Sequence, residues 1–241
     1  MKLLIMAGHS ANGYKGSGAV GALNESNETR RLAQKVVSYL KDMGIQADYI
    51  SHDKPSTSDY LKEQVSKANS KGTYDCMVQI HFNAASASAK GTETYYLSDK
   101  GKVFADRVNT KLSTLFKNRG VKKGNYYWLK NTTSPAILIE TCFCTNNDDA
   151  KTYTQNFNKV AQLIAEGLAN KAYVVPAPKD ESFKVKVYNC TTLNARSGPG
   201  TEYPIKDTVK FGTILTIVGS SGNWYKTKSG LYISKTYCKK I

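Results

Sequence analysis

The 241-residue sequence contains no apolar run that approaches the roughly 20 residues of a transmembrane helix, so we expect no membrane insertion. The apolar start of the chain, Leu3 to Ala7, is also too short for the core of a secretory signal peptide. The chain is therefore expected to be synthesised in the cytoplasm without an export signal of its own.

Cysteine is scarce, and its number does not suggest pairing. The five cysteines are Cys76, Cys142, Cys144, Cys190 and Cys238. Neither the odd count nor the spacing indicates a disulfide framework. Free thiols favour folding in a reducing compartment.

Acidic residues are few. The chain has 19 Asp and Glu against 34 Lys and Arg, which gives a formal net charge of +15. The excess is uneven, because residues 183–241 hold ten basic and two acidic residues, whereas the first 182 residues hold 24 and 17. This imbalance indicates an anionic partner. Nucleic acid, an anionic wall polymer and a membrane surface all remain open, since the sign of the charge does not distinguish them.

Apolar periodicity predicts alternating strands and helices over the first 170 residues. Strands are expected at 2–7, 45–50, 75–82, 91–97 and 136–141, and helices at 25–43, 59–70, 101–117 and 148–170. This alternation predicts an α/β fold, a mostly parallel twisted sheet with helices on both faces. We assign residues 1–171 to this domain.

The composition changes near residue 172. Residues 172–182 contain two prolines and no helical pattern, which predicts a linker. Residues 183–241 contain short β-rich segments separated by turn signals such as Ser197–Gly200 and Ser220–Asn223. Short strands at this spacing predict a second domain, a small β-barrel.

Three predicted strands end in residues that could carry chemistry. His9 ends the first strand, His81 lies at the end of the third, and Glu140 lies at the end of the last apolar strand. In a parallel sheet the carboxyl ends of the strands share one edge, which is where open α/β sheets bind ligands. We therefore expect these three side chains to converge.

Two histidines and one carboxylate form a known ligand set for catalytic zinc, which leaves one position open for water. Glu25 is the best candidate for the third ligand, because it begins a predicted helix directly after the loop that starts beside His9. Glu28, one turn further on, is the alternative. Glu140 would then be free to act as general base toward a zinc-activated water.

Simpler interpretations exist for each residue. A single histidine at a strand end is more often structural than a ligand, but the chain has only three histidines and two fall at this edge. His52 is expected to be a solvated loop residue. Gly16, Gly18 and Gly21 match the dinucleotide-binding spacing, but they do not follow their strand immediately as that motif requires. We interpret them as part of a flexible loop beside the site.

As a set, these residues resemble a known family, the zinc-dependent N-acetylmuramoyl-L-alanine amidases of type 3. The resemblance covers roughly residues 1–170 and is carried, in order, by Ala7–His9, Asn24–Glu25, Ile80–Ala84 and Ile139–Glu140. It implies one Zn²⁺ ion bound by His9, Glu25 and His81, with Glu140 as the catalytic residue. It also implies hydrolysis of the amide bond between N-acetylmuramic acid and the L-alanine of the stem peptide.

The segment after Glu140 is also similar to that family, but Cys142 and Cys144 stand where Gly and Ser are commoner. We expect both cysteines to pack rather than to bind the metal.

The basic C-terminal part, residues 183–241, resembles bacterial SH3-type modules in Leu193–Gly200, Gly212–Val218 and Asn223–Tyr225, with Tyr232 where such modules usually have a Trp. A wall hydrolase joined to such a module resembles phage endolysins. This implies bacterial peptidoglycan and anionic wall polymers as partners, rather than nucleic acid, and action at the cell wall after release.

Three alternatives remain at this point. The first is a host autolysin of the same chemistry. The second is a non-catalytic wall-binding protein whose function lies in the basic module. The third is a nicotinamide-dependent oxidoreductase, which a chelator would separate from a zinc amidase.

Overall fold

The computed structural model describes residues 1–55, 59–175 and 182–241, and the chain divides into two compact units, Met1–Val175 and Pro176–Ile241. The predicted linker, 172–182, falls mostly on residues 176–181, which lie outside the described residues. Among the described residues, no helix is long and apolar enough to cross a membrane.

The first unit is built on a six-stranded sheet with the strand order β2-β1-β3-β6-β4-β5. The strands are β1 (Lys2–Ser10), β2 (Gln46–His52), β3 (Cys76–Asn83), β4 (Thr92–Tyr96), β5 (Asn118–Lys123) and β6 (Ala136–Phe143). Strands β2, β1, β3 and β6 are mutually parallel, while β4 pairs antiparallel with β6 and parallel with β5. The predicted fold class, a mostly parallel sheet, is confirmed.

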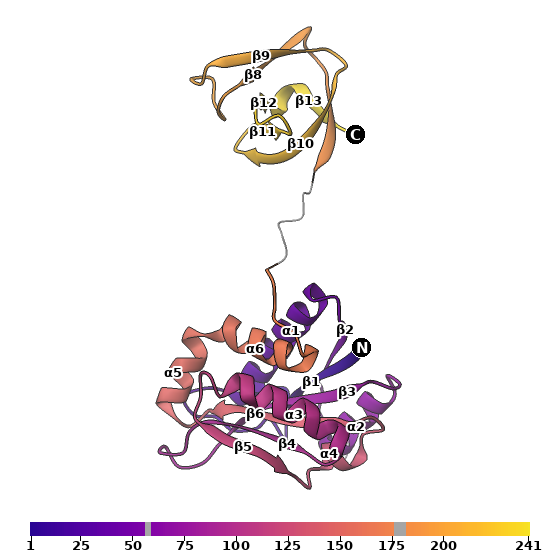
Figure 1. Cartoon of the computed structure of the whole chain (residues 1–241), viewed down its shortest axis with the longest axis vertical. Coiled ribbons are helices and arrows are strands. Elements are labelled where there is room, and N and C mark those ends of the chain that lie inside the picture. Colours follow the sequence, from indigo (N-terminus) through magenta and orange to yellow (C-terminus); the bar gives the residue numbers. More distant parts are fainter. Residues whose placement is uncertain (56–58, 176–181) are drawn as a thin grey trace. The chain divides into compact units, whose positions relative to one another are not determined.

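Helices cover both faces of this sheet (Figure 1). One core contains residues of α1 (Glu25–Asp42), α3 (Asp99–Leu112), α5 (Asn147–Gln155) and α6 (Phe157–Ala169), and the other contains residues of α2 (Tyr60–Asn69) and α4 (Tyr127–Asn131). Leu3 and Ile5 of β1 point into the first core, and Leu4 and Met6 point into the second. Because β1 is buried on both sides, its sequence is a continuous apolar run rather than an alternating one.

This unit differs from the sequence prediction in several places. The predicted helix 101–117 ends at Leu112, and the short helix α4 was not predicted. The expected helix 148–170 is two helices, which meet at Asn156, a residue with φ −117° and ψ 22°. Strand β5 was not predicted, because its sequence, NRGVKK, is polar and lies at the edge of the sheet, where no apolar pattern is required.

The second unit is a seven-stranded antiparallel sheet with the order β13-β7-β10-β11-β12-β8-β9. Its elements are β7 (Phe183–Val187), β8 (Thr192–Arg196), β9 (Ile205–Lys210), β10 (Ile214–Ser221), β11 (Trp224–Thr227), β12 (Tyr232–Ser234), a 3₁₀ helix (Lys235–Tyr237) and β13 (Cys238–Lys240). Six small and aliphatic side chains form its buried core: Val185, Val187, Leu193, Ala195, Ile217 and Ile233. The predicted small β-rich module is confirmed.

Candidate metal centre

The sheet brings the predicted strand-end residues to one edge. His9 lies near the end of β1, and β1 pairs in parallel with β3, which carries His81. Strand β6 lies on the other side of β3, and Glu140 is the register partner of His81. Since all three strands run in the same direction, their carboxyl ends are neighbours, as the sequence predicted.

Glu25 joins the two histidines from the first residue of α1. Its Oε1 lies 3.1 Å from Nε2 of His9 and 3.2 Å from Nδ1 of His81. The same oxygen accepts a hydrogen bond from the backbone N–H of Phe82 at 3.0 Å, and Oε2 accepts one from the N–H of Ala19 at 2.9 Å. These four contacts fix both oxygens of a side chain that is only 4% exposed.

Hydrogen bonding also keeps Glu25 charged. Burial by itself raises the pKa of this carboxyl group, but the hydrogen bonds and the charges of His81 and His9 outweigh it and hold the pKa well below its ordinary value. The group is therefore a carboxylate at neutral pH, the form in which it can bind a metal ion.

The backbone fixes the ring of His9 in the orientation that a ligand needs. Its Nδ1 lies 3.1 Å from the carbonyl oxygen of Gly16. Because a carbonyl only accepts, this contact places a proton on Nδ1 and leaves Nε2 facing Glu25, where a metal ion can replace the proton shared by the two groups. Two acceptors 3.1 Å apart require a cation or a proton between them. Contacts of this kind to the outer ring nitrogen are typical of metal-binding histidines.

The residues present fit a tetrahedral metal ion. His9, Glu25 and His81 each offer one ligand atom, and these atoms lie within 4.8 Å of one another. Two ligand atoms that are each about 2.0–2.1 Å from a tetrahedral ion lie about 3.3 Å apart, which agrees with the contacts of 3.1 and 3.2 Å to Glu25. Three side chains leave one coordination position open.

The glycine-rich loop packs against this cluster. A Cβ atom on Gly18, which has φ +79°, would lie 2.6 Å from Oε2 of Glu25 and 2.8 Å from the ring of His9. His9 itself has φ 63°, an uncommon conformation for a residue other than glycine. Positive φ angles outside glycine concentrate at functional sites. Of the glycines in the apparent dinucleotide motif, Gly18 therefore makes room for the cluster.

Glu140 lies beside the cluster without belonging to it. The residue is partly buried, but its Oε2 is fully enclosed and has no hydrogen-bond partner in the described part of the chain. Burial, with the negative charges of Glu25 and Glu93, raises the pKa of Glu140 to about 8. A carboxyl group with such a pKa can accept a proton near neutral pH and hold it.

The structure separates the two candidates for the third ligand. Glu28 is directed elsewhere, because its carboxylate accepts hydrogen bonds from Arg31 at 2.7 Å and from the hydroxyl of Tyr153 at 2.9 Å. Glu25, three residues earlier, is the acid that reaches both histidines.

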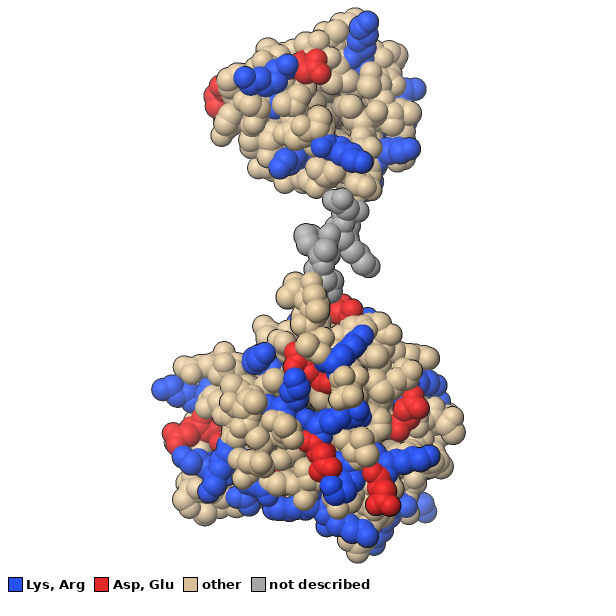
Figure 2. All heavy atoms as spheres, in the orientation of Figure 1, with Lys and Arg blue, Asp and Glu red and all other residues tan. Residues whose placement is uncertain are grey.

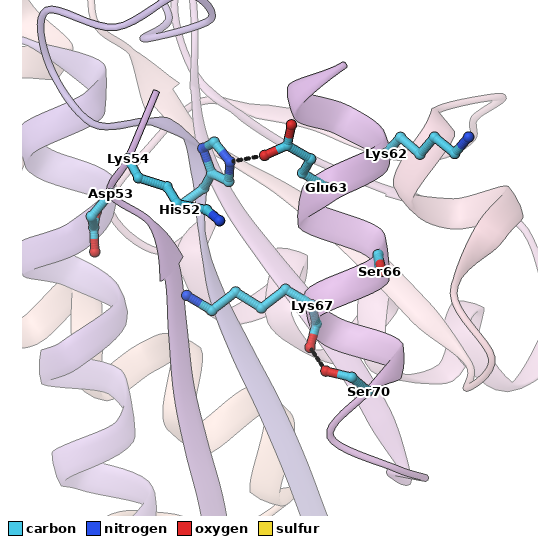
Figure 3. A pocket seen from close by; sticks show the side chains of 8 residues that line it. All are labelled: His52, Asp53, Lys54, Lys62, Glu63, Ser66, Lys67 and Ser70. Atoms are coloured by element: carbon cyan, nitrogen blue, oxygen red, sulfur yellow. Dashed lines mark hydrogen bonds and ion pairs between the residues drawn. The ribbon is translucent and has the colours of Figure 1, made fainter. Parts of the chain in front are cut away.

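His52 was expected to be a solvated loop residue, and this prediction was wrong. It is the last residue of β2 and only 2% exposed. Figure 3 shows its ring directed at Glu63 of α2, with Nε2 3.0 Å from the carboxylate, while Nδ1 lies 3.2 Å from the hydroxyl of Ser10. The hollow of about 730 Å³ that it lines contains none of the four predicted site residues.

Cys142 and Cys144 are both fully buried and free. Burial raises the pKa of each thiol, to about 11 for Cys144, which disfavours the thiolate that a metal would bind. Neither belongs to the group of candidate ligands, His9, Glu25 and His81, that the described residues contain.

Sequence reasoning did not identify the buried acid Glu93, which lies next to the site. It is the register partner of Glu140 on the neighbouring strand β4 and is 2% exposed. Asn83, Tyr95, Arg119 and Lys122 all donate hydrogen bonds to it. The only signal in the sequence is an acid inside a strand of otherwise uncharged residues, TETYY, and a buried charge of that kind requires partners.

Comparison with known proteins agrees with this geometry. The profile of the N-acetylmuramoyl-L-alanine amidase family matches residues 3–170, and that of the bacterial SH3 domain matches residues 191–238. The endolysin of Bacillus phage SPP1 is 30% identical over 265 residues, with 95% of this chain and 93% of the phage protein covered. The amidase LytC of Bacillus subtilis is 34% identical over 175 residues, which is 68% of this chain and 34% of LytC.

A further relative is an uncharacterised protein of Clostridium perfringens, 30% identical, and the chain spans 60% of its length. Among solved structures, the catalytic domain of an endolysin targeting Clostridium difficile is 33% identical with a TM-score of 0.66, covering 71% of this chain and 98% of that domain. The catalytic domain of the Bacillus polymyxa amidase CwlV is 32% identical with a TM-score of 0.61, over 70% of this chain and 97% of that domain.

Proposed function

We propose that this chain, which belongs to the N-acetylmuramoyl-L-alanine amidase family, is a zinc-dependent peptidoglycan hydrolase. It cleaves the amide bond between N-acetylmuramic acid and the L-alanine of the stem peptide. One observation carries the proposal: His9, Glu25 and His81 converge at the carboxyl edge of the sheet, with Glu140 on the adjacent strand.

His9, Glu25 and His81 would hold the ion. Two imidazole nitrogens and one carboxylate oxygen form a donor set that is known from catalytic zinc sites, and this favours zinc over harder cations. A zinc ion bound there supplies Lewis acidity, which activates water and polarises the substrate carbonyl. The Gly16 carbonyl and the Phe82 amide hold two of the three ligands in place before the metal binds.

Glu140 moves the proton. As water attacks the amide carbon, Glu140 takes one proton from the water, and a carbon–oxygen bond forms. The carbon–nitrogen bond then breaks, and Glu140 passes the proton to the departing alanine nitrogen, so that the carboxylate is regenerated. Its pKa, raised to about 8, suits both steps, because the group is a stronger base than an exposed carboxylate and still a competent acid.

The decisive experiment is digestion of purified cell walls by the zinc-loaded chain. An amidase releases free amino groups of L-alanine and creates no reducing sugar ends. Release of reducing ends without alanine would instead identify a glycosidase. Glu140→Gln should lower the rate of alanine release by a factor of roughly 10²–10⁴, the range typical of general acid–base groups, and should keep one metal ion per chain. Glu28→Gln, the matched control one turn along the same helix, should keep both metal and activity.

We further propose that the C-terminal module binds anionic wall polymers. Lys186 of β7 and Lys239 of β13 are register partners, both exposed on the outer face of the sheet. Like charges directly opposite each other are unfavourable in a sheet, and an anionic ligand relieves this repulsion. Figure 2 shows that basic side chains outnumber acidic ones on the visible face of this unit.

The biological role that fits best is that of an endolysin, synthesised in the host cytoplasm and acting at the wall after release. The similarity covers 93% of the SPP1 endolysin and 95% of this chain, but only 34% of LytC and 68% of this chain. An endolysin predicts that cells expressing the chain stay intact until the membrane is permeabilised, and then lyse within minutes. Lysis without permeabilisation would favour an exported autolysin.

A further inference from the structure

The buried carboxylate of Glu93 contacts two cationic side chains, although one would balance its single negative charge. Its Oε2 accepts hydrogen bonds from Nε of Arg119 at 2.8 Å and from Nζ of Lys122 at 2.5 Å. Its Oε1 accepts from the amide of Asn83 and the hydroxyl of Tyr95, both at 2.8 Å. One cation would neutralise the carboxylate, so the second leaves a net charge of about +1 in the cluster.

Arg119 is oriented by two contacts that leave part of its guanidinium group unused. The group lies over the ring of Phe143, 4.8 Å from the ring centre, and its Nε donates to Glu93. The two terminal nitrogens have no hydrogen-bond partner in the described part of the chain, and the side chain is 32% exposed. A guanidinium held in this way presents a planar pair of donors that matches a carboxylate.

The cluster lies on the catalytic side of the sheet. Glu93 and Glu140 are direct partners on adjacent antiparallel strands, so their side chains project from the same face. On the other side of β6, His81 is the partner of Glu140. Asn83 links the metal-site side of this face to the Glu93 cluster, because it follows His81 by two residues on β3 and its side-chain amide donates a hydrogen bond to Glu93.

The spacing suits a carboxylate on the second residue of a bound peptide. Adjacent strands are about 4.8 Å apart. Arg119 and Lys122 lie on the next strand, β5, and their donor nitrogens are 2.5–2.8 Å from the carboxylate of Glu93. An extended peptide advances about 3.3–3.6 Å per residue, so its second residue lies about 7 Å from the scissile bond. A hollow of about 360 Å³ lined by Tyr95, Gly124, Asn125 and Tyr126 adjoins the cluster through Tyr95.

We propose that Arg119 and Lys122, held by Glu93, form a carboxylate subsite for the stem peptide. The inference rests on the proposed amidase function and specifies its substrate. In the stem peptide, the residue after L-alanine is an acidic residue whose α-carboxyl group is either free or amidated. The subsite binds the free carboxylate, so the enzyme prefers stem peptides that are not amidated at this residue.

The test compares two soluble disaccharide-peptides that differ only in this group, carboxylate or carboxamide. The value of kcat/KM is measured for both with the zinc-loaded full chain. Wild-type protein should favour the carboxylate about 10- to 100-fold, as expected for charge-assisted hydrogen bonds. Arg119→Gln should reduce kcat/KM for the carboxylate substrate by a similar factor and change that for the carboxamide less than about threefold.

Two further variants keep the test specific. Lys122→Gln leaves the contact between Arg119 and Glu93 in place and should reduce the preference in the same direction. Lys123→Gln, a matched control at the next position of β5, exposed and outside the cluster, should leave the preference unchanged. A wild-type preference below about twofold, or an equal loss for both substrates in Arg119→Gln, overturns the subsite alone. No cleavage of either substrate by metal-loaded wild type overturns the amidase function and the subsite with it.

Discussion

The raised pKa of Glu140 predicts that this side chain, the proposed general base, destabilises the metal-free fold. The folded group has a pKa of about 8 against an ordinary value of 4.5. Below pH 4.5 the carboxyl group is protonated in both the folded and the unfolded chain. As the pH rises from 4.5 toward 8, the unfolded chain releases this proton and the folded chain keeps it, so the stability of the fold falls.

The magnitude follows from the difference in pKa. Each unit corresponds to about 1.4 kcal/mol, so at pH 7 the group lowers the free energy of unfolding by about 3 kcal/mol relative to its value at pH 4.5. Glu140→Gln has no titrating group at this position. In the presence of a chelator, the variant should therefore gain about 3 kcal/mol over wild type between pH 4.5 and pH 7.

Urea denaturation followed by tryptophan fluorescence measures this difference. Trp128 lies in the first unit and is 3% exposed, while Trp224 lies in the second. In a Trp224→Phe background, tryptophan fluorescence therefore reports only on the unfolding of the first unit. The unfolding of the second unit then does not contribute to the measured transition. A difference between wild type and Glu140→Gln that stays within about 0.5 kcal/mol across this pH range would refute the reasoning, since the full shift corresponds to several times that value.

Three other outcomes follow from the site and the module. His81→Ala should reduce bound zinc from one ion per chain to almost none, measured by atomic emission, and alanine release should fall with it. Gly18→Ala would place a Cβ 2.6 Å from Oε2 of Glu25. We expect the zinc affinity, measured by competition with a chelating dye, to fall about 10- to 100-fold, as it does when other groups that orient metal ligands are disturbed. An unchanged affinity would mean that the loop does not support Glu25. Charge reversal at Lys186 and Lys239 should reduce the amount of chain that sediments with purified walls at low salt. The difference from wild type should be smaller at about 0.5 M salt, because screening suppresses the attraction between surface charges. Equal binding of variant and wild type at low salt would exclude this face as the polymer contact.

Much of the catalytic domain could be predicted from the sequence, because its signals are local. Buried parallel strands are continuous apolar runs, as Leu3–Ala7 shows, and the residue types at their ends are apparent by inspection. Strand β5 and the break at Asn156 lacked such a signal. The first is a polar edge strand, and the second depends on how α5 and α6 pack rather than on a proline or glycine.

The sequence by itself determined that His9, His81 and Glu140 would meet, because the carboxyl ends of parallel strands form one edge whatever the details of packing. Only the tertiary structure decided between Glu25 and Glu28. Both are acids of the same first helical turn, and the rotation of the helix on the sheet selects which one faces the histidines.

The tertiary structure also decided the environment of residues that lie outside the sequence motifs. The burial of His52, the last residue of β2, against α2 depends on how these two elements pack. The gathering of Arg119 and Lys122 around Glu93 likewise depends on the pairing of β4 with β5. The protonation of Glu140 is also a tertiary property, because burial and the neighbouring charges of Glu25 and Glu93 set its pKa. Residue type is a local property of the chain, whereas desolvation and charge–charge distance exist only after folding.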